Sequence, residues 1–143
     1  MAKLPESERK RLWYEVAKIW DIGRGVWWHP LGETSRTDVI AFEVTDFDAA
    51  IGVNGLKDIL ARHQVSQVWY FPEFDEVPAQ LMDLSDAEFR YTRSTEGYWC
   101  DSHWDWLIYA SHEESITLGG DWLIAEVKRL WPQWEGHLWR TGG

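Results

Sequence analysis

The feature that most constrains the fold of this chain is its hydrophobic period, which changes twice along the sequence. Over residues 6–21 the apolar residues form one stripe with the period of an α-helix, and Gly23 and Gly25 end it. A second stripe of this kind starts at Asp121, the expected N-cap, and ends or bends at Pro132. Between the two stripes, residues 38–44 instead alternate with period two, and other apolar segments are rich in β-branched and aromatic residues, both of which are typical of β-strands.

The alternating and β-branched segments predict five strands. They are residues 38–44, 65–71, 97–100, 106–110 and 115–118. The last two are joined by a turn around His112-Glu113, which indicates an antiparallel hairpin. A short helix with Asn54 as its cap is expected after the first strand. Residues 73–96 show little periodicity and are expected to form a long acidic loop with one turn of helix near Ser85.

Strands that follow one another, with helices at the chain ends, indicate an α+β fold. We expect a single domain spanning residues 1–143. Its sheet is expected to be mixed or antiparallel, with about five strands and with the helices at both chain ends packed on one face. The length agrees, because 143 residues is usual for one domain and allows roughly two thirds of the unfolded surface to be buried.

The formal net charge of −10 is concentrated in one part of the chain, residues 73–114, which we call the acidic stretch. It contains two Lys/Arg and eleven Asp/Glu, a charge of −9, whereas residues 115–143 contain three of each. Such an excess produces a negative field that steers basic partners and speeds their association. It also repels nucleic-acid phosphates, and no basic stripe is present, so a nucleic-acid partner is not expected.

Tryptophan is the other unusual feature of the composition, with twelve residues. Those on the helical stripes are expected in the core; they are Trp13, Trp20 and Trp131. Trp27-Trp28 and the Trp104/Trp106 pair differ, because adjacent or alternating positions near turns need not all point inward. Exposed tryptophan is typical of protein interfaces and of carbohydrate stacking, and both interpretations stand beside core packing.

Aromatic residues are interleaved with the acids of the acidic stretch, as in an interface with a charged rim and aromatic anchors. The hypothesis we favour is a non-enzymatic binding protein whose acidic face neutralises a basic protein partner, as bacterial immunity proteins do with toxins. This analogy is one of type and rests on no shared motif. An inhibitor that mimics DNA would need the same negative face. The residues expected at the interface are Asp75, Glu76, Asp83, Asp86, Glu88, Trp99, Asp101, Trp104, Asp105 and Trp106.

A small enzyme using Cys100, His103 or His112 is the first alternative. A nucleophilic cysteine needs a nearby base, but positions 100 and 103 of one strand point to opposite faces, so a turn would have to join them. Asp101 and Asp105 would also raise the pKa of the thiol. The sequence at His112 begins like a zinc-protease motif, yet Ile116 stands where the second histidine is needed. We therefore expect no cofactor or metal.

A small-molecule or carbohydrate-binding domain is the second alternative, with Trp27 and Trp28 lining a groove. A structural subunit with an apolar, oligomer-forming patch is the third. The single cysteine, Cys100, allows no internal disulfide, which fits a reducing compartment. The N-terminus has no apolar signal segment, and no run approaches the ~18 apolar residues of a membrane span. We expect a cytoplasmic protein without membrane contact.

Overall fold

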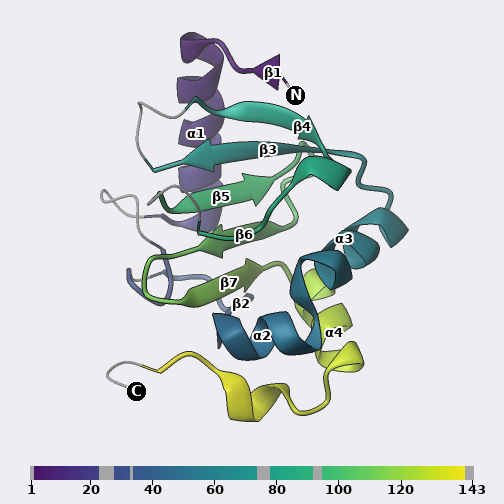
Figure 1. Cartoon of the computed structure of the whole chain (residues 1–143). Coiled ribbons are helices and arrows are strands. Elements are labelled where there is room, and N and C mark those ends of the chain that lie inside the picture. Colours follow the sequence, from purple (N-terminus) through teal and green to yellow (C-terminus); the bar gives the residue numbers. More distant parts are fainter. Residues whose placement is uncertain (1, 23–27, 33, 74–77, 92–94, 141–143) are drawn as a thin grey trace.

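A seven-stranded antiparallel sheet forms the centre of the structure, in the order β1-β4-β3-β5-β6-β7-β2 (Figure 1). The strands are β1 (Ala2–Lys3), β2 (Val39–Glu43), β3 (Gln67–Pro72), β4 (Gln80–Asp83), β5 (Gly97–Cys100), β6 (Leu107–Ala110) and β7 (Ser115–Gly119). The helices are α1 (Glu6–Trp20), α2 (Val44–Ala50), α3 (Gly52–Arg62) and α4 (Asp121–Leu130), with 3-10 turns η1 (Leu84–Asp86) and η2 (Trp134–His137). This computed structural model describes residues 2–22, 28–32, 34–73, 78–91 and 95–140.

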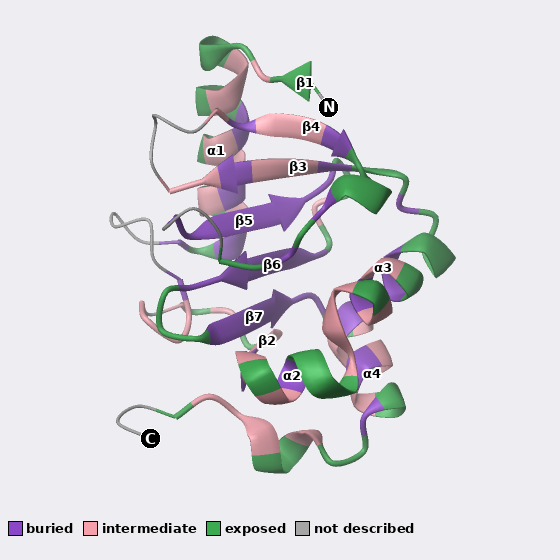
Figure 2. Cartoon of the chain, in the orientation of Figure 1, coloured by how far each residue is buried: buried purple, intermediate pink, exposed green. Residues whose placement is uncertain are grey.

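Successive residues of the central strands alternate between two hydrophobic cores, one on each face of the sheet. On β6, Leu107 and Tyr109 belong to the core that contains α1, whereas Ile108 and Ala110 belong to the core that contains α2, α3 and α4. Strands β5, β6 and β7 are buried along their whole length (Figure 2). A sheet buried on both faces needs helices on both faces, and the structure supplies them.

The α+β class and the antiparallel sheet are therefore confirmed, with two differences of detail. The sheet has seven strands, because β4 lies inside the segment expected to be a loop and the two-residue β1 pairs with it. The helices at the two chain ends do not share a face: α1 crosses the strands on one face, and α4 packs on the other (Figure 1). The physical reason is that the central strands have no polar face that could stand in solvent.

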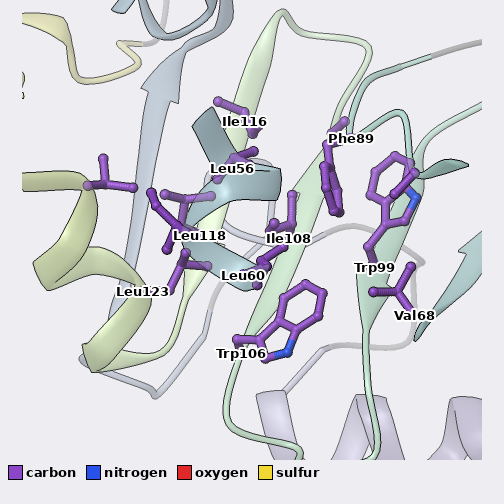
Figure 3. Close-up of a cluster of buried hydrophobic side chains, with 14 of the residues drawn as sticks. Leu56, Leu60, Val68, Phe89, Trp99, Trp106, Ile108, Ile116, Leu118 and Leu123 are labelled. Atoms are coloured by element: carbon purple, nitrogen blue, oxygen red, sulfur yellow. The ribbon is translucent and has the colours of Figure 1, made fainter. Parts of the chain in front are cut away.

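The core between the sheet and the α3 side is filled by large side chains (Figure 3). Leu56 and Leu60 of α3 point toward Ile108 and Leu118 of the sheet. Asn54 is not the cap of this helix; α3 begins at Gly52, directly after α2, which the sequence did not predict. Glu43 starts α2, since its side chain accepts a hydrogen bond from the Thr45 N–H.

The terminal segments of the chain lie at both edges of the sheet. At one edge, β1 pairs with β4. At the other edge, Leu138 forms an antiparallel bridge with Phe42 of β2, and the Trp139 N–H donates to the Ala41 carbonyl oxygen at 3.1 Å. Strand β1 is only two residues long and the bridge at Leu138 occupies part of the β2 edge, which shortens the edge available to a second chain. Among the described helices, none combines the length and the apolar character needed to cross a membrane.

Candidate functional site

The structure separates the residues predicted at the interface. Asp75 and Glu76 lie outside the described residues. Trp99 and Trp106 are 2 % and 0 % exposed, and both belong to the core on the α3 side (Figure 3). A partner cannot reach either ring, so these two tryptophans are core residues and not interface anchors.

The remaining predicted residues gather mainly at one end of the sheet. The exposed acids are Asp83, Asp86, Glu88 and Asp105, while Trp104 is partly buried and Asp101 is 6 % exposed. Strands β4 and β5 both pair with β3 and end where β3 begins. Asp83 is the register partner of Gln67, the first residue of β3, and Asp101 follows β5 on the other side. Antiparallel pairing thus brings Asp83 and Asp101 to the same end of the sheet.

A groove of about 380 Å³ lies at this end of the sheet. It is lined by Glu8, Gln64, Val65, Ser66, Gln67, Trp69, Leu81, Asp101, Ser102 and His103, and we call it the Trp69 groove. The Trp69 ring, partly exposed, lies with its centroid 5.3 Å from that of Trp104. Trp104 was chosen from the sequence but Trp69 was missed, because the continuous apolar run 68–71 does not show which of its side chains reach solvent.

The buried carboxylate of the Trp69 groove belongs to Asp101. Its Oδ1 accepts the His103 N–H at 3.0 Å, and its Oδ2 lies 3.0 Å from His103 Nδ1. These hydrogen bonds hold the turn in which Trp104 has a positive φ of 61°. The hydrogen bond and the charge of Asp101 raise the pKa of His103, whose side chain is 64 % exposed. Protonated His103 then balances the charge of Asp101.

A larger cleft of about 670 Å³ lies near the opposite end of the sheet, where β2 ends and β7 begins. It is lined by Glu43, Asp46, Glu113, Glu114, Gly136, His137, Leu138, Trp139 and Arg140, and we call it the acidic cleft. Its carboxylates come from the end of β2, from α2 and from the β6–β7 turn. His137 Nδ1 lies 2.9 Å from Asp46 Oδ2, and the Trp139 indole N–H donates to the Glu113 carbonyl oxygen at 2.9 Å.

The β6–β7 turn that supplies two of these carboxylates is held by a buried glutamate, Glu96, which is 1 % exposed. Its Oε1 accepts the Tyr109 hydroxyl at 2.7 Å, and its Oε2 accepts the His112 N–H at 3.0 Å. Oε2 also lies 2.5 Å from His112 Nδ1, and this hydrogen bond raises the pKa of His112. Burial, followed by the neighbouring Tyr98 and Glu96, raises the pKa of Tyr109.

The residues of the enzymatic alternative are not brought together. Cys100 is fully buried in the core beside α1, and burial together with Asp101 raises the pKa of its thiol, as the sequence predicted for Asp101. His103 is hydrogen-bonded to Asp101, and His112 lies at the other end of the sheet. A turn does follow Cys100, as a cysteine–histidine pair would require. In this turn, however, His103 is hydrogen-bonded to Asp101. Within the described part of the chain, no group of three or more His, Cys, Asp or Glu side chains could hold a metal ion.

The groove expected at Trp27 and Trp28 is not formed by Trp28, which is fully buried. Its indole N–H donates to the Trp20 carbonyl oxygen at 3.1 Å, and the two rings meet edge to face. A Cβ at Gly119 would lie within 3 Å of both rings, so this strand position needs glycine. Trp27 lies outside the described residues.

Comparison with known proteins gives no assignment: no family model matches the chain, and neither a curated protein nor a solved structure shows significant similarity. Function is therefore inferred from the acidic cleft and the Trp69 groove. The acidic cleft joins residues that are far apart in the sequence, and local patterns could not indicate it.

Proposed function

We propose that this protein is a non-enzymatic binding protein that captures a basic protein partner, in the manner of an immunity-type inhibitor of a bacterial toxin. The acidic cleft is the observation that carries the proposal. Three separate segments place Glu43, Asp46, Glu113 and Glu114 around one cavity. Arg140 also lines the cleft, so the formal charge of its lining is −3 with His137 neutral, and this negative charge favours a cationic partner.

Charge and aromatic content support the same proposal. The chain carries a net charge of −10, which attracts basic surfaces over distance and speeds association. The partly exposed Trp139 lines the acidic cleft and gives a partner an aromatic surface to pack against. Lysine and arginine side chains of the partner would pair with the carboxylates around it.

The exposed acids predicted from the sequence extend the negative surface beyond the cleft. Asp83, Asp86, Glu88 and Asp105 are exposed and do not line the cleft. In the proposal they contribute to the field that steers the partner, and the cleft provides the contacts. Asp101 is engaged by His103 and is assigned to the Trp69 groove. The proposal places the protein in the cytoplasm, without a membrane or nucleic-acid partner.

A pull-down with two charge-matched variants tests the proposal. The cleft variant carries Glu43→Gln, Asp46→Asn, Glu113→Gln and Glu114→Gln. The control variant carries Asp83→Asn, Asp86→Asn, Glu88→Gln and Asp105→Asn, which removes the same formal charge elsewhere. Tagged proteins are incubated with lysate of the native cell at low and moderate salt, and retained proteins are identified by mass spectrometry.

One basic protein retained by the wild type and by the control variant, but not by the cleft variant, would support the proposal. Binding by purified components, measured by calorimetry, then gives the affinity. A bait that retains nothing at either salt concentration would contradict the proposal. Equal loss from both variants would show that total charge, and not the cleft, determines binding.

A further inference from the structure

We infer that the Trp69 groove is a binding site for a neutral, polyhydroxylated ligand, a saccharide unit. The inference does not rest on the proposed function, because the groove and the acidic cleft lie at different ends of the sheet and share no lining residue. The groove, at about 380 Å³, falls within the ~300–1,000 Å³ typical of small-molecule sites.

The first argument is the polar lining of the groove. The lining includes two glutamines, Gln64 and Gln67, and two serines, Ser66 and Ser102, whose exposed side chains carry amide and hydroxyl groups. Each of these groups can both donate and accept hydrogen bonds. A sugar hydroxyl also does both, so a ring bearing several hydroxyls can satisfy this lining, whereas an apolar ligand would leave it unpaired.

The second argument is the aromatic wall. One face of a sugar ring is formed by C–H groups, and an indole ring provides a flat apolar surface for it. Trp69 is partly exposed and lines the groove together with the apolar Leu81 and Val65. Strand pairing places Trp69 between Leu81 of β4 and Cys100 of β5. Its position is therefore fixed before a ligand binds, which lowers the entropic cost of binding.

The third argument is the charge of the lining. Asp101 and His103 form an ion pair, with 3.0 Å between Oδ2 and Nδ1. Among the described residues that line the groove, Glu8 is then the remaining ionisable side chain. This carboxylate repels anions and accepts hydrogen bonds from hydroxyls. The formal charge of the lining, with histidines counted as neutral, is −2 here (Glu8 and Asp101) and −3 in the acidic cleft (four carboxylates and Arg140). Protonated His103 lowers the negative charge of the groove further, so a neutral ligand suits the groove better.

NMR titration of the full chain tests the inference. The probes are glucose, galactose, N-acetylglucosamine, maltose and cellobiose, each raised to about 20 mM, which saturates a site with a Kd near 1 mM. We expect at least one of them to shift the Gln64 and Gln67 side-chain amide signals and the Trp69 indole signal in a saturable way. The indole signals of the buried Trp28 and of Trp139 in the acidic cleft should stay in place.

Two variants locate the site. Gln67→Ala removes one lining amide at an exposed position and should weaken binding of the active saccharide about fivefold. Gln133→Ala removes an exposed amide that does not line the groove, and it should leave the affinity unchanged. The cleft variant should also bind the saccharide normally, so failure of the proposed function would not affect this result.

Three outcomes would overturn the inference. The first is the absence of saturable shifts with all five saccharides. The second is binding that Gln67→Ala and Gln133→Ala weaken equally. The third is agmatine, a guanidinium probe, binding at the groove more tightly than every saccharide, which would assign the groove to cationic ligands.

Discussion

Oε2 of the buried Glu96 accepts the backbone N–H of His112 at 3.0 Å and lies 2.5 Å from Nδ1 of the same residue. One carboxylate oxygen thus holds both the backbone and the side chain of His112 in the β6–β7 turn. Oε1 is satisfied separately by the Tyr109 hydroxyl. A buried carboxylate is costly unless it is hydrogen-bonded and paired, and here both conditions are met.

Replacing this carboxylate should destabilise the protein. Glu96→Gln removes the negative charge and presents an amide NH₂ to one of the donors, so it should lower the free energy of unfolding by about 2 kcal/mol. Urea denaturation followed by circular dichroism measures the change. Glu113→Gln alters an exposed carboxylate that also lies near His112, at 3.2 Å, and should change stability by about 0.5 kcal/mol or less. Equal effects of the two substitutions would contradict the role given to Glu96.

The pairing also predicts a pH dependence of stability. The folded-state pKa of His112 is raised above the ordinary value of 6.5, chiefly by the hydrogen bond with Glu96. A raised pKa contributes stability that is fully present below the unfolded pKa and is lost as the pH rises through the folded pKa. The free energy of unfolding should therefore fall as the pH rises above about 6.5 and through the raised pKa of His112.

Two histidine variants resolve this pH dependence. Asp101 raises the pKa of His103, as Glu96 raises that of His112. His112→Gln and His103→Gln should therefore each remove part of the fall in unfolding free energy with rising pH. Burial lowers the pKa of His29, so this residue affects the free energy of unfolding at pH values below the ordinary histidine pKa, outside this range. Urea denaturation of both variants across the range is the measurement. An unchanged slope in both variants would show that other groups determine it.

The sequence predicted the long, periodic elements well. Helices α1 and α4 and strands β5, β6 and β7 lie where the hydrophobic period indicated. The turn of helix near Ser85 is confirmed as η1. Strand β4 was missed because its sequence, Gln80–Asp83, contains no β-branched or aromatic residue and lies in the acidic segment expected to be a loop. Helix α2 was missed because it is seven residues long and buries only Phe47.

The candidate surfaces were harder to predict than the elements. Alternation assigns residues to two faces but cannot say which face is exposed, and on β5 and β6 both are buried. Trp99 was therefore expected at an interface, although it lies in the core. The acidic cleft depends on the pairing of Glu43 with Ser115, which brings α2 beside the β6–β7 turn. No local pattern encodes a contact between segments so far apart.

The difference between core and surface tryptophans is measurable. Trp99→Ala should lower the free energy of unfolding by about 3–5 kcal/mol, because it leaves a cavity against Phe89 and Tyr70, whose rings contact it. Trp104→Ala should cost about 1 kcal/mol, since that ring is partly exposed. Guanidinium denaturation of the two variants gives the comparison. A small effect of Trp99→Ala would contradict its place in the core.

The C-terminal segment should protect the β2 edge of the sheet. Ending the chain after His137 removes Leu138, which bridges to Phe42, and Trp139, whose two N–H groups donate to the Ala41 and Glu113 carbonyl oxygens. Loss of these two hydrogen bonds should lower the free energy of unfolding by about 2 kcal/mol. The uncovered β2 edge should also pair with other chains, which light scattering detects as concentration-dependent association.

A second truncation separates this effect from simple shortening. Ending the chain after Arg140 keeps Leu138 and Trp139 in place, so stability and light scattering should match those of the full chain. Because the acidic cleft is also lined by residues 136–140, the shorter truncation product should lose any partner that binds there, while saccharide binding at the Trp69 groove should persist. A product ending at His137 that stays monomeric and fully stable would mean that β2 needs no cover, and the bridge at Leu138 would then contribute nothing to the sheet.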